Sequence, residues 1–189
     1  SHLTTADLSE TKIERLEEFI FTRCSQLKTI KLPSTITSIG ACALSETDLT
    51  EFVVPGTITE LGQGLFRNCP RLTTIDFSKC KVTNIPVAML TKCSALAKIE
   101  FPTNCKKIEK LAFAYSGISQ IELPATLVEI EQGAFCNCSF LTSIDLSQSK
   151  LEKVGKMTFS GCTSLKTVTF PDKAPSYGDF AFANTAFTK

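Results

Sequence analysis

The residues of this chain that could take part in chemistry are nine cysteines, a single histidine and a set of regularly spaced carboxylates. The histidine, His2, follows Ser1, and residues 1–2 resemble the remnant of a removed purification tag. Nucleophilic catalysis needs a base such as histidine beside the serine or cysteine that attacks. Because His2 is the only histidine in the sequence, we expect no catalytic residue and no enzymatic activity.

Cysteine recurs at one position of a repeating pattern, where it alternates with threonine and serine. The residues at this position are Cys24, Thr47, Cys69, Cys93, Ser116, Cys138, Cys162 and Thr185. A free thiol packs as a small apolar group, so this column is predicted to point inward. Thiol reagents should then react mainly at a loop cysteine such as Cys80. Disulfides between neighbouring units are geometrically conceivable, but the odd number of cysteines argues against a disulfide framework.

Metal and cofactor sites find little support. Cys136 and Cys138 form one close pair, but structural zinc usually takes four ligands, and no second pair or histidine stands at ligand spacing. The segment 62–64 (GQG) lacks the third glycine of a dinucleotide-binding loop, so we interpret it as a turn. A small group of lysines is interpreted as a solvated face, with anion binding as the alternative: Lys106, Lys107, Lys110, Lys153 and Lys156. We expect no metal and no cofactor.

Carboxylates recur one position before an apolar residue in four consecutive units. They are Asp76, Glu100, Glu122 and Asp145, and the residues two positions earlier are Thr74, Lys98, Gln120 and Ser143. Alternation along a strand would turn both columns outward and bring the carboxylates about 5 Å apart on neighbouring strands. These eight residues are our candidate partner-binding site, suited to a basic protein segment or a cation. The alternative is a solvated strand face on which nearby lysines relieve the repulsion.

The elements that position these residues belong to a chain of ordinary globular composition. It has 189 residues, of which 43% are hydrophobic and 21% charged, and a net charge of +1. This near-neutral balance gives no support to a nucleic-acid partner. No apolar run reaches the roughly 18 residues that a membrane span requires.

The whole chain is one array of repeats. An apolar-x-x-apolar-x-apolar motif opens units at 3, 27, 49, 72, 96, 118, 141 and 165, and a partial unit begins at 187. Steps of 24, 22 and 23 residues recur in that order and give a longer period of 69. The 24-residue units carry Asp-(Leu/Phe)-Ser, and the 22-residue units have a shortened junction before the next unit. We therefore expect residues 3–189 to form a single domain of stacked units.

The opening motif matches a leucine-rich repeat, and the period lies in that class. Ile30 and Leu32 alternate as they would in a short strand with both side chains inward. No unit contains a helix-length amphipathic run. We predict an α/β-type but mostly β, right-handed solenoid of about eight units. Its concave side should carry a parallel sheet on the order of 35 Å long, and its convex side should carry turns or short second strands.

Three segments carry a family resemblance: 133–144 (GAFCNCSFLTSI), 158–168 (TFSGCTSLKTV) and 32–40 (LPSTITSIG). They resemble the BspA-like leucine-rich repeats of bacterial and protozoan surface proteins. The resemblance implies a cell-surface or secreted adhesin that binds a host extracellular protein, and it transfers no catalytic or ligand residue. One departure is that acidic residues replace the usual hydroxyl residues on the exposed strand face.

Two functions follow as hypotheses. The first is a non-enzymatic protein–protein interaction module of a cell-surface protein, acting in adhesion or host-protein binding through the concave face. The alternative is an intracellular, cytoplasmic interaction scaffold, because reducing compartments keep thiols free. Since solenoids need polar terminal units and standard units stand at both ends of this sequence, we also expect either a longer array or end-to-end self-association.

Overall fold

Fifteen short strands, all paired in parallel, make up the regular secondary structure of residues 2–188, which the computed structural model describes. No helix occurs within this range. Ser1, and with it part of the expected tag remnant at residues 1–2, lies outside the described residues, as does Lys189 at the end of the partial unit. The expected mostly β repeat solenoid is confirmed.

The turns of the solenoid, here called rungs, contribute strands of two kinds, except that the rung opening at residue 118 has only the shorter kind. Three-residue strands carry the opening motif: β1 (Thr5–Asp7), β3 (Thr29–Lys31), β5 (Glu51–Val53), β7 (Thr74–Asp76), β9 (Lys98–Glu100), β12 (Ser143–Asp145) and β14 (Thr167–Thr169). Two-residue strands follow on another side: β2 (Arg15–Leu16), β4 (Ser38–Ile39), β6 (Glu60–Leu61), β8 (Asn84–Ile85), β10 (Lys107–Ile108), β11 (Glu129–Ile130), β13 (Lys153–Val154) and β15 (Ser176–Tyr177). The short second strands were expected.

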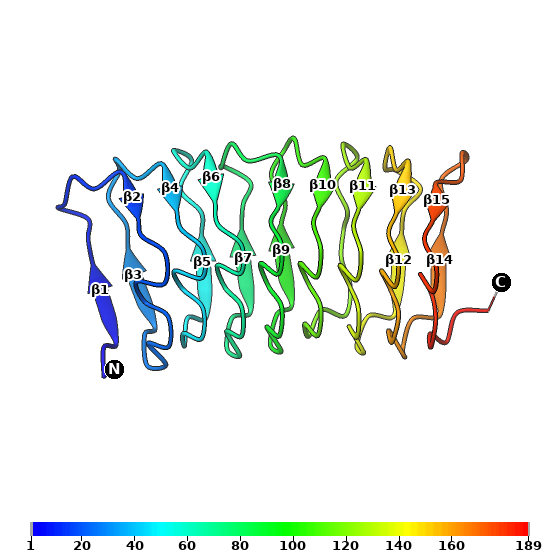
Figure 1. Cartoon of the computed structure of the whole chain (residues 1–189), viewed down its shortest axis with the longest axis horizontal. Helices are drawn as coiled ribbons and strands as arrows, with labels where there is room; N and C mark the ends of the chain where they lie inside the picture. The colour runs from blue at the N-terminus through cyan, green and yellow to red at the C-terminus, as the bar shows by residue number, and fades with distance from the viewer. Residues whose placement is uncertain (1, 189) are drawn as a thin grey trace.

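The two kinds of strand form two rows along the length of the molecule, with the termini at opposite ends (Figure 1). We call the row of three-residue strands the long-strand face and the other row the short-strand face. The long-strand face holds the sheets β1-β3, β5-β7-β9 and β12-β14. The short-strand face holds β2-β4-β6 and β8-β10-β11-β13-β15. Each rung thus pairs with its neighbours, as expected of a quasi-one-dimensional fold.

The expected parallel pairing is present on the long-strand face, but it does not run through all eight units as one sheet. Strand pairing is absent between β3 and β5, and again between β9 and β12, where residues 120–124 have no regular secondary structure. Both interruptions begin at a 22-residue step, where a single residue joins the turn to the next opening motif: Asp48 in one unit and Gly117 in the other. The units that open at 27, 72, 96, 141 and 165 are preceded by two residues there. The shorter connection places the following segment differently, so the hydrogen bonds to the preceding strand are lost.

The third side of each rung is a turn in which two residues four positions apart have positive φ, such as Leu111 at 58° and Tyr115 at 60°. Alternate N–H groups of this turn donate to the next rung. Phe113 donates to the Ala134 carbonyl at 2.7 Å, and Tyr115 donates to the Cys136 carbonyl at 2.9 Å. These bonds satisfy backbone groups that no strand pairs, so the turns also join neighbouring rungs.

The core is a continuous stack of apolar side chains between the three sides. One column contributes a fully buried aromatic or leucine from most rungs: Leu44, Phe66, Leu90, Phe113, Phe135 and Phe159. The inward residues of the long strands pack on this column, as Phe52 does on Phe66 with ring centroids 5.0 Å apart. Because the core fills all the inward positions, only outward columns remain for binding.

Candidate functional site

A hollow of about 640 Å³ opens on the long-strand face at the second interruption of the sheet. We call it the acidic hollow, and its lining comprises Ala97, Lys98, Ile99, Glu100, Phe101, Gln120, Ile121, Glu122, Leu123, Pro124, Ser143 and Asp145. Six of the eight residues of the candidate site therefore lie around one depression. The other two, Thr74 and Asp76, lie on β7, whose neighbour β9 contributes to the lining.

Lys98 is the lysine in the lining of the acidic hollow. Its ammonium group donates to Glu100 Oε1 at 2.9 Å, and this bond is the main cause of a raised Lys98 pKa. The charges of Asp76 and Glu122 raise the Lys98 pKa further. Within the lining, Glu100, Glu122 and Asp145 thus stand against one lysine, while Asp76 on the flank also lies near Lys79. The acidic hollow consequently has an excess of negative charge that is available to a cationic partner.

Two of the four aspartate and glutamate residues have a local structural function. In the Asp-x-Ser motif, the aspartate Oδ1 accepts a hydrogen bond from the serine backbone N–H: Asp76 from Ser78 at 2.7 Å and Asp145 from Ser147 at 2.8 Å. Hydrogen bonding to the serine is the first cause of a lowered pKa at both aspartates. Such Asx turns fix the corner that follows a strand, and the sequence reasoning missed this function.

The expected ladder of four carboxylates on consecutive strands is corrected by the pairing. Asp76 and Glu100 do occupy paired positions on β7 and β9. Glu122 lies in the segment without strand pairing, and Asp145 pairs with Thr169 of β14 rather than with Glu122. The four residues are therefore arranged around a hollow instead of along a regular column, because the sheet is interrupted between them.

A second hollow was not anticipated from the sequence. It measures about 330 Å³ and is lined by Lys28, Thr29, Ile30, Leu32, Leu49, Thr50, Glu51, Phe52, Val53 and Pro55. We call it the apolar hollow, after its most exposed hydrophobic side chain, Val53, which is 58% exposed. It lies at the first interruption of the sheet. The 69-residue period of the sequence could have predicted this hollow, because the two interruptions of the sheet lie 69 residues apart in the chain.

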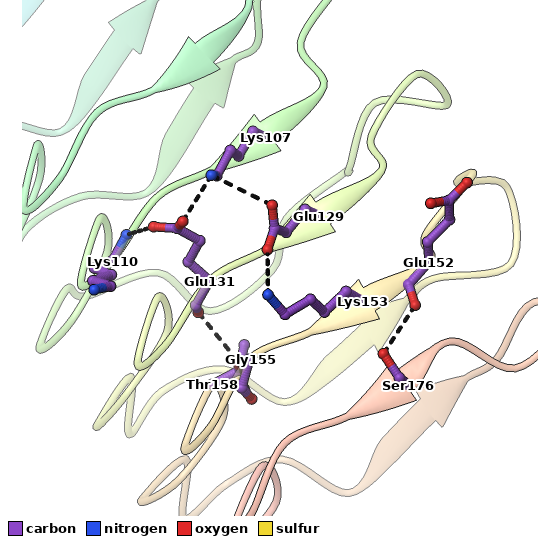
Figure 2. A network of polar contacts seen from close by, with 9 residues as sticks. All are labelled: Lys107, Lys110, Glu129, Glu131, Glu152, Lys153, Gly155, Thr158 and Ser176. Atoms are coloured by element: carbon purple, nitrogen blue, oxygen red, sulfur yellow. Dashed lines mark hydrogen bonds and ion pairs between the residues drawn. The ribbon is translucent and has the colours of Figure 1, made fainter.

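Three members of the lysine group, Lys107, Lys110 and Lys153, belong to a network on the short-strand face (Figure 2). Lys107 contacts Glu131 at 2.7 Å and Glu129 at 3.4 Å, and Lys153 contacts the other oxygen of Glu129 at 2.9 Å. Lys156 is paired with Asp179 at 3.1 Å. Three of the five lysines are thus matched by carboxylates on their own or neighbouring rungs, which supports the interpretation of a solvated, charge-balanced face over an anion site.

The cysteine column is buried, as predicted. Cys93 donates to the Phe66 carbonyl at 3.0 Å and Cys162 to the Phe135 carbonyl at 3.1 Å. Cys80 does not match its prediction: it is buried and donates to the Phe77 carbonyl at 3.1 Å. The partly exposed thiols are Cys42 and Cys136 instead. Cys80 follows a strand within an inward-folded corner, whereas Cys42 and Cys136 belong to the turn side of the rung.

A parallel stack of short-stranded rungs with an aromatic core defines a leucine-rich-repeat solenoid of the all-strand kind. Sequence comparison gives the same result in finer detail. The chain matches the BspA type leucine-rich repeat region, with six copies, over residues 1–119 and 83–189. It belongs to this family, whose fold is a non-catalytic scaffold that typically mediates protein interactions. No helix of residues 2–188 is long and apolar enough to cross a membrane.

Solved structures with the same fold come from several bacteria. A leucine-rich repeat protein from Bacteroides ovatus has 23% identity and a TM-score of 0.73, covering 93% of this chain and 53% of that one. A leucine-rich repeat protein from Eubacterium ventriosum has 23% identity and a TM-score of 0.70, covering 99% and 44%. The pneumococcal vaccine antigen PcpA has 18% identity and a TM-score of 0.57, covering 100% and 58%.

A curated relative comes from a plant. The probable disease resistance protein At4g19520 of Arabidopsis thaliana is 27% identical over 197 residues, which span 91% of this chain and 11% of the plant protein. The chain thus corresponds to a small part of that relative and to about half of the two bacterial structures named first. These likenesses establish the fold, while the partner has to be argued from the surface of this chain.

Proposed function

We propose that this chain is a non-enzymatic protein-binding module that takes a basic segment of its partner into the acidic hollow. The observation that carries the proposal is the convergence of Glu100, Glu122 and Asp145 on one depression where Lys98 is the only lysine of the lining. Partly buried Ile99, Phe101 and Ile121 form apolar walls. Apolar walls with a charged rim suit a lysine or arginine side chain, whose stem is apolar and whose end is cationic.

The partner-binding residues in this proposal are those of the acidic hollow and its flank: Asp76, Glu100, Glu122, Asp145, Thr74, Lys98, Gln120 and Ser143. Attraction between such charges is weakened by salt. Binding should therefore be strongest at low ionic strength and should select lysine-rich or arginine-rich sequences.

The test is a selection of random peptides displayed on phage against the immobilised chain, followed by affinity measurements with the enriched peptides. The double variant Glu100→Gln, Glu122→Gln should bind them about tenfold more weakly at low salt, because two charges are removed. The matched control is Glu14→Gln, Glu60→Gln, which removes two exposed carboxylates far from the acidic hollow in sequence. Undiminished binding by the Glu100/Glu122 variant would rule out recognition through this hollow.

The place of action in this proposal is the cell surface, where the module would contribute to adhesion or host-protein binding. The family resemblance supports it, since BspA-like proteins are described as surface adhesins. The second candidate is an intracellular interaction scaffold, which is favoured by the nine free cysteines because oxidising compartments favour disulfides. The complete gene discriminates between them: a signal peptide or surface anchor supports the first, and its lack supports the second.

A further inference from the structure

The two hollows of the long-strand face occupy equivalent positions of the 69-residue period. Adding 69 to Ile30, Leu32, Phe52 and Val53 of the apolar hollow gives Ile99, Phe101, Ile121 and Glu122 of the acidic hollow. Pro55 and Pro124 correspond in the same way. The depressions thus arise from one recurring feature of the repeat, the 22-residue step that interrupts the sheet. A binding surface built in this way contains two subsites at a fixed separation.

The two subsites differ in chemistry because some positions 69 residues apart carry different residues. Val53 stands in the apolar hollow where Glu122 stands in the acidic one, and Lys31 is the counterpart of Glu100. Lys31 is neutralised by Asp7 at 3.0 Å. The walls of the apolar hollow include Ile30, Leu32 and Phe52. The charged residues of its lining, Lys28 and Glu51, have opposite signs. This subsite therefore offers an apolar contact with little net charge, in contrast to the negative rim of its counterpart.

The separation of the subsites follows from the stacking of rungs. Equivalent positions are three rungs apart, which is about 14 Å at the usual strand spacing of roughly 4.8 Å. In an extended chain, residues four positions apart lie on the same face and are separated by about 13 Å. The residue midway between them would face the intervening strand β7, which carries Thr74 and Asp76. The spacing of alternate side chains in an extended peptide thus agrees with the separation expected for three stacked rungs.

We propose that the long-strand face binds an extended segment of a partner protein that runs along the solenoid axis and enters both hollows. An apolar side chain occupies the apolar hollow, and a lysine or arginine four residues away occupies the acidic hollow. A basic residue at the midway position faces Asp76. This inference rests on the proposed function for the acidic hollow and adds a second subsite, a spacing rule and an alignment of the peptide with the solenoid axis.

The test uses synthetic peptides and chemical shifts of the ¹⁵N-labelled chain. The probe is the acetylated, amidated peptide Gly-Phe-Ser-Lys-Ser-Arg-Gly, together with its reversed sequence, because the surface leaves the chain direction open. Shifts are expected at the amides of Phe52 and Val53 and at those of Gln120 and Glu122. The isomer Gly-Phe-Ser-Lys-Arg-Ser-Gly places arginine three residues after phenylalanine instead of four, so that its side chain faces away from the surface. It should bind about tenfold more weakly.

Two variants identify the apolar subsite. Val53→Ser should weaken the phenylalanine peptide about tenfold, because an aromatic side chain loses its apolar contact. The same substitution should not change the affinity for a control peptide in which serine replaces phenylalanine. Met157→Ser, which alters an exposed apolar side chain on the turn side of a rung, should affect neither peptide. Because Val53 is exposed, its replacement leaves the core intact.

Three results would overturn the inference: shifts confined to the acidic hollow, equal affinity of the two arginine spacings, or no binding by any of the peptides. None of these results tests the proposed function, which is tested separately by the affinity of the Glu100/Glu122 variant for the peptides selected by phage display. If those selected peptides lose affinity on that substitution while the spacing peptides show no preference, the acidic hollow binds alone. If both assays fail, recognition through this face is excluded.

Discussion

The rings of Phe113 and Phe135 stack face to face on adjacent rungs, with centroids 5.0 Å apart and planes inclined by 3°. Phe159 continues the stack at 5.4 Å and Phe182 at 5.3 Å. The first three side chains are fully buried. Since each rung packs mainly on its neighbours, this aromatic column is a principal connection between the rungs that bear the acidic hollow and those that follow.

Shortening the central member of the stack should destabilise the solenoid strongly. Phe135→Ala removes two ring contacts and leaves a cavity, so the free energy of unfolding should fall by about 3–5 kcal/mol. Phe135→Leu keeps most of the volume and should cost about 1.5 kcal/mol or less. Urea denaturation followed by circular dichroism measures both. A loss below about 1 kcal/mol in the alanine variant would contradict the structural importance of the stack.

A side chain at Gly155 should force two rungs apart. A Cβ atom there would lie 2.5 Å from the backbone nitrogen of Gln132 on the preceding rung, and that backbone cannot move without breaking the inter-rung hydrogen bonds. Gly155→Ala is therefore expected to cost about 1–3 kcal/mol. At Gly56 the nearest atom would be 3.2 Å away, so Gly56→Ala should cost less. Equal melting temperatures for the two variants would count against the close-approach argument.

Thiol reagents should distinguish two cysteines from the other seven. Cys42 and Cys136 are partly exposed, whereas the rest are buried. Burial raises the pKa of the Cys105 thiol to about 11 and also raises that of Cys136, which lowers the reactive thiolate fraction. In native protein, Ellman's reagent should therefore react fastest at Cys42, and all nine thiols should titrate in denaturant. Cys42→Ser should abolish the fast phase, and Cys80→Ser should leave it intact.

Acid should weaken the fold through the aspartates of the Asp-x-Ser turns. Hydrogen bonds from Ser9 lower the pKa of Asp7 to about 2, and those from Ser78 and Ser147 lower the pKa of Asp76 and Asp145. A folded-state pKa below the unfolded value near 3.9 stabilises the protein above that pH. This contribution is present at neutral pH and is lost as the pH falls from about 4 towards 2. Melting temperatures recorded across this range measure the loss.

Variants at Asp76 separate the charge from the hydrogen bond. Asp76→Asn keeps an oxygen that accepts from the Ser78 N–H but does not titrate, so its melting temperature should depend less on pH below 4. Asp76→Ala loses the bond and should cost about 0.5–1 kcal/mol at neutral pH. An asparagine variant with the full acid dependence of the wild type would show that Asp76 does not contribute to it.

The sequence by itself determined the repeating architecture. The apolar residues of the opening motif and the recurring Phe or Leu column can be buried only if the units stack, so period and pattern together define a solenoid with outward and inward columns. The inward cysteine column followed from the same reasoning, because Thr47 and Ser116 share its position with Cys69 and Cys138. In each case, the information is local and repeats from unit to unit.

The site required the tertiary structure. Neighbouring long strands fail to pair where the corner is one residue shorter, at Asp48 and Gly117. The residue types around these corners do not reveal this loss of pairing. The loss of pairing turned an expected column of carboxylates into a hollow around Lys98, and it produced the apolar hollow at Val53. The exposure of Cys42 and the burial of Cys80 were likewise decided by corner geometry. Strand pairing depends on the alignment of hydrogen-bonding groups between rungs, which only the assembled stack fixes.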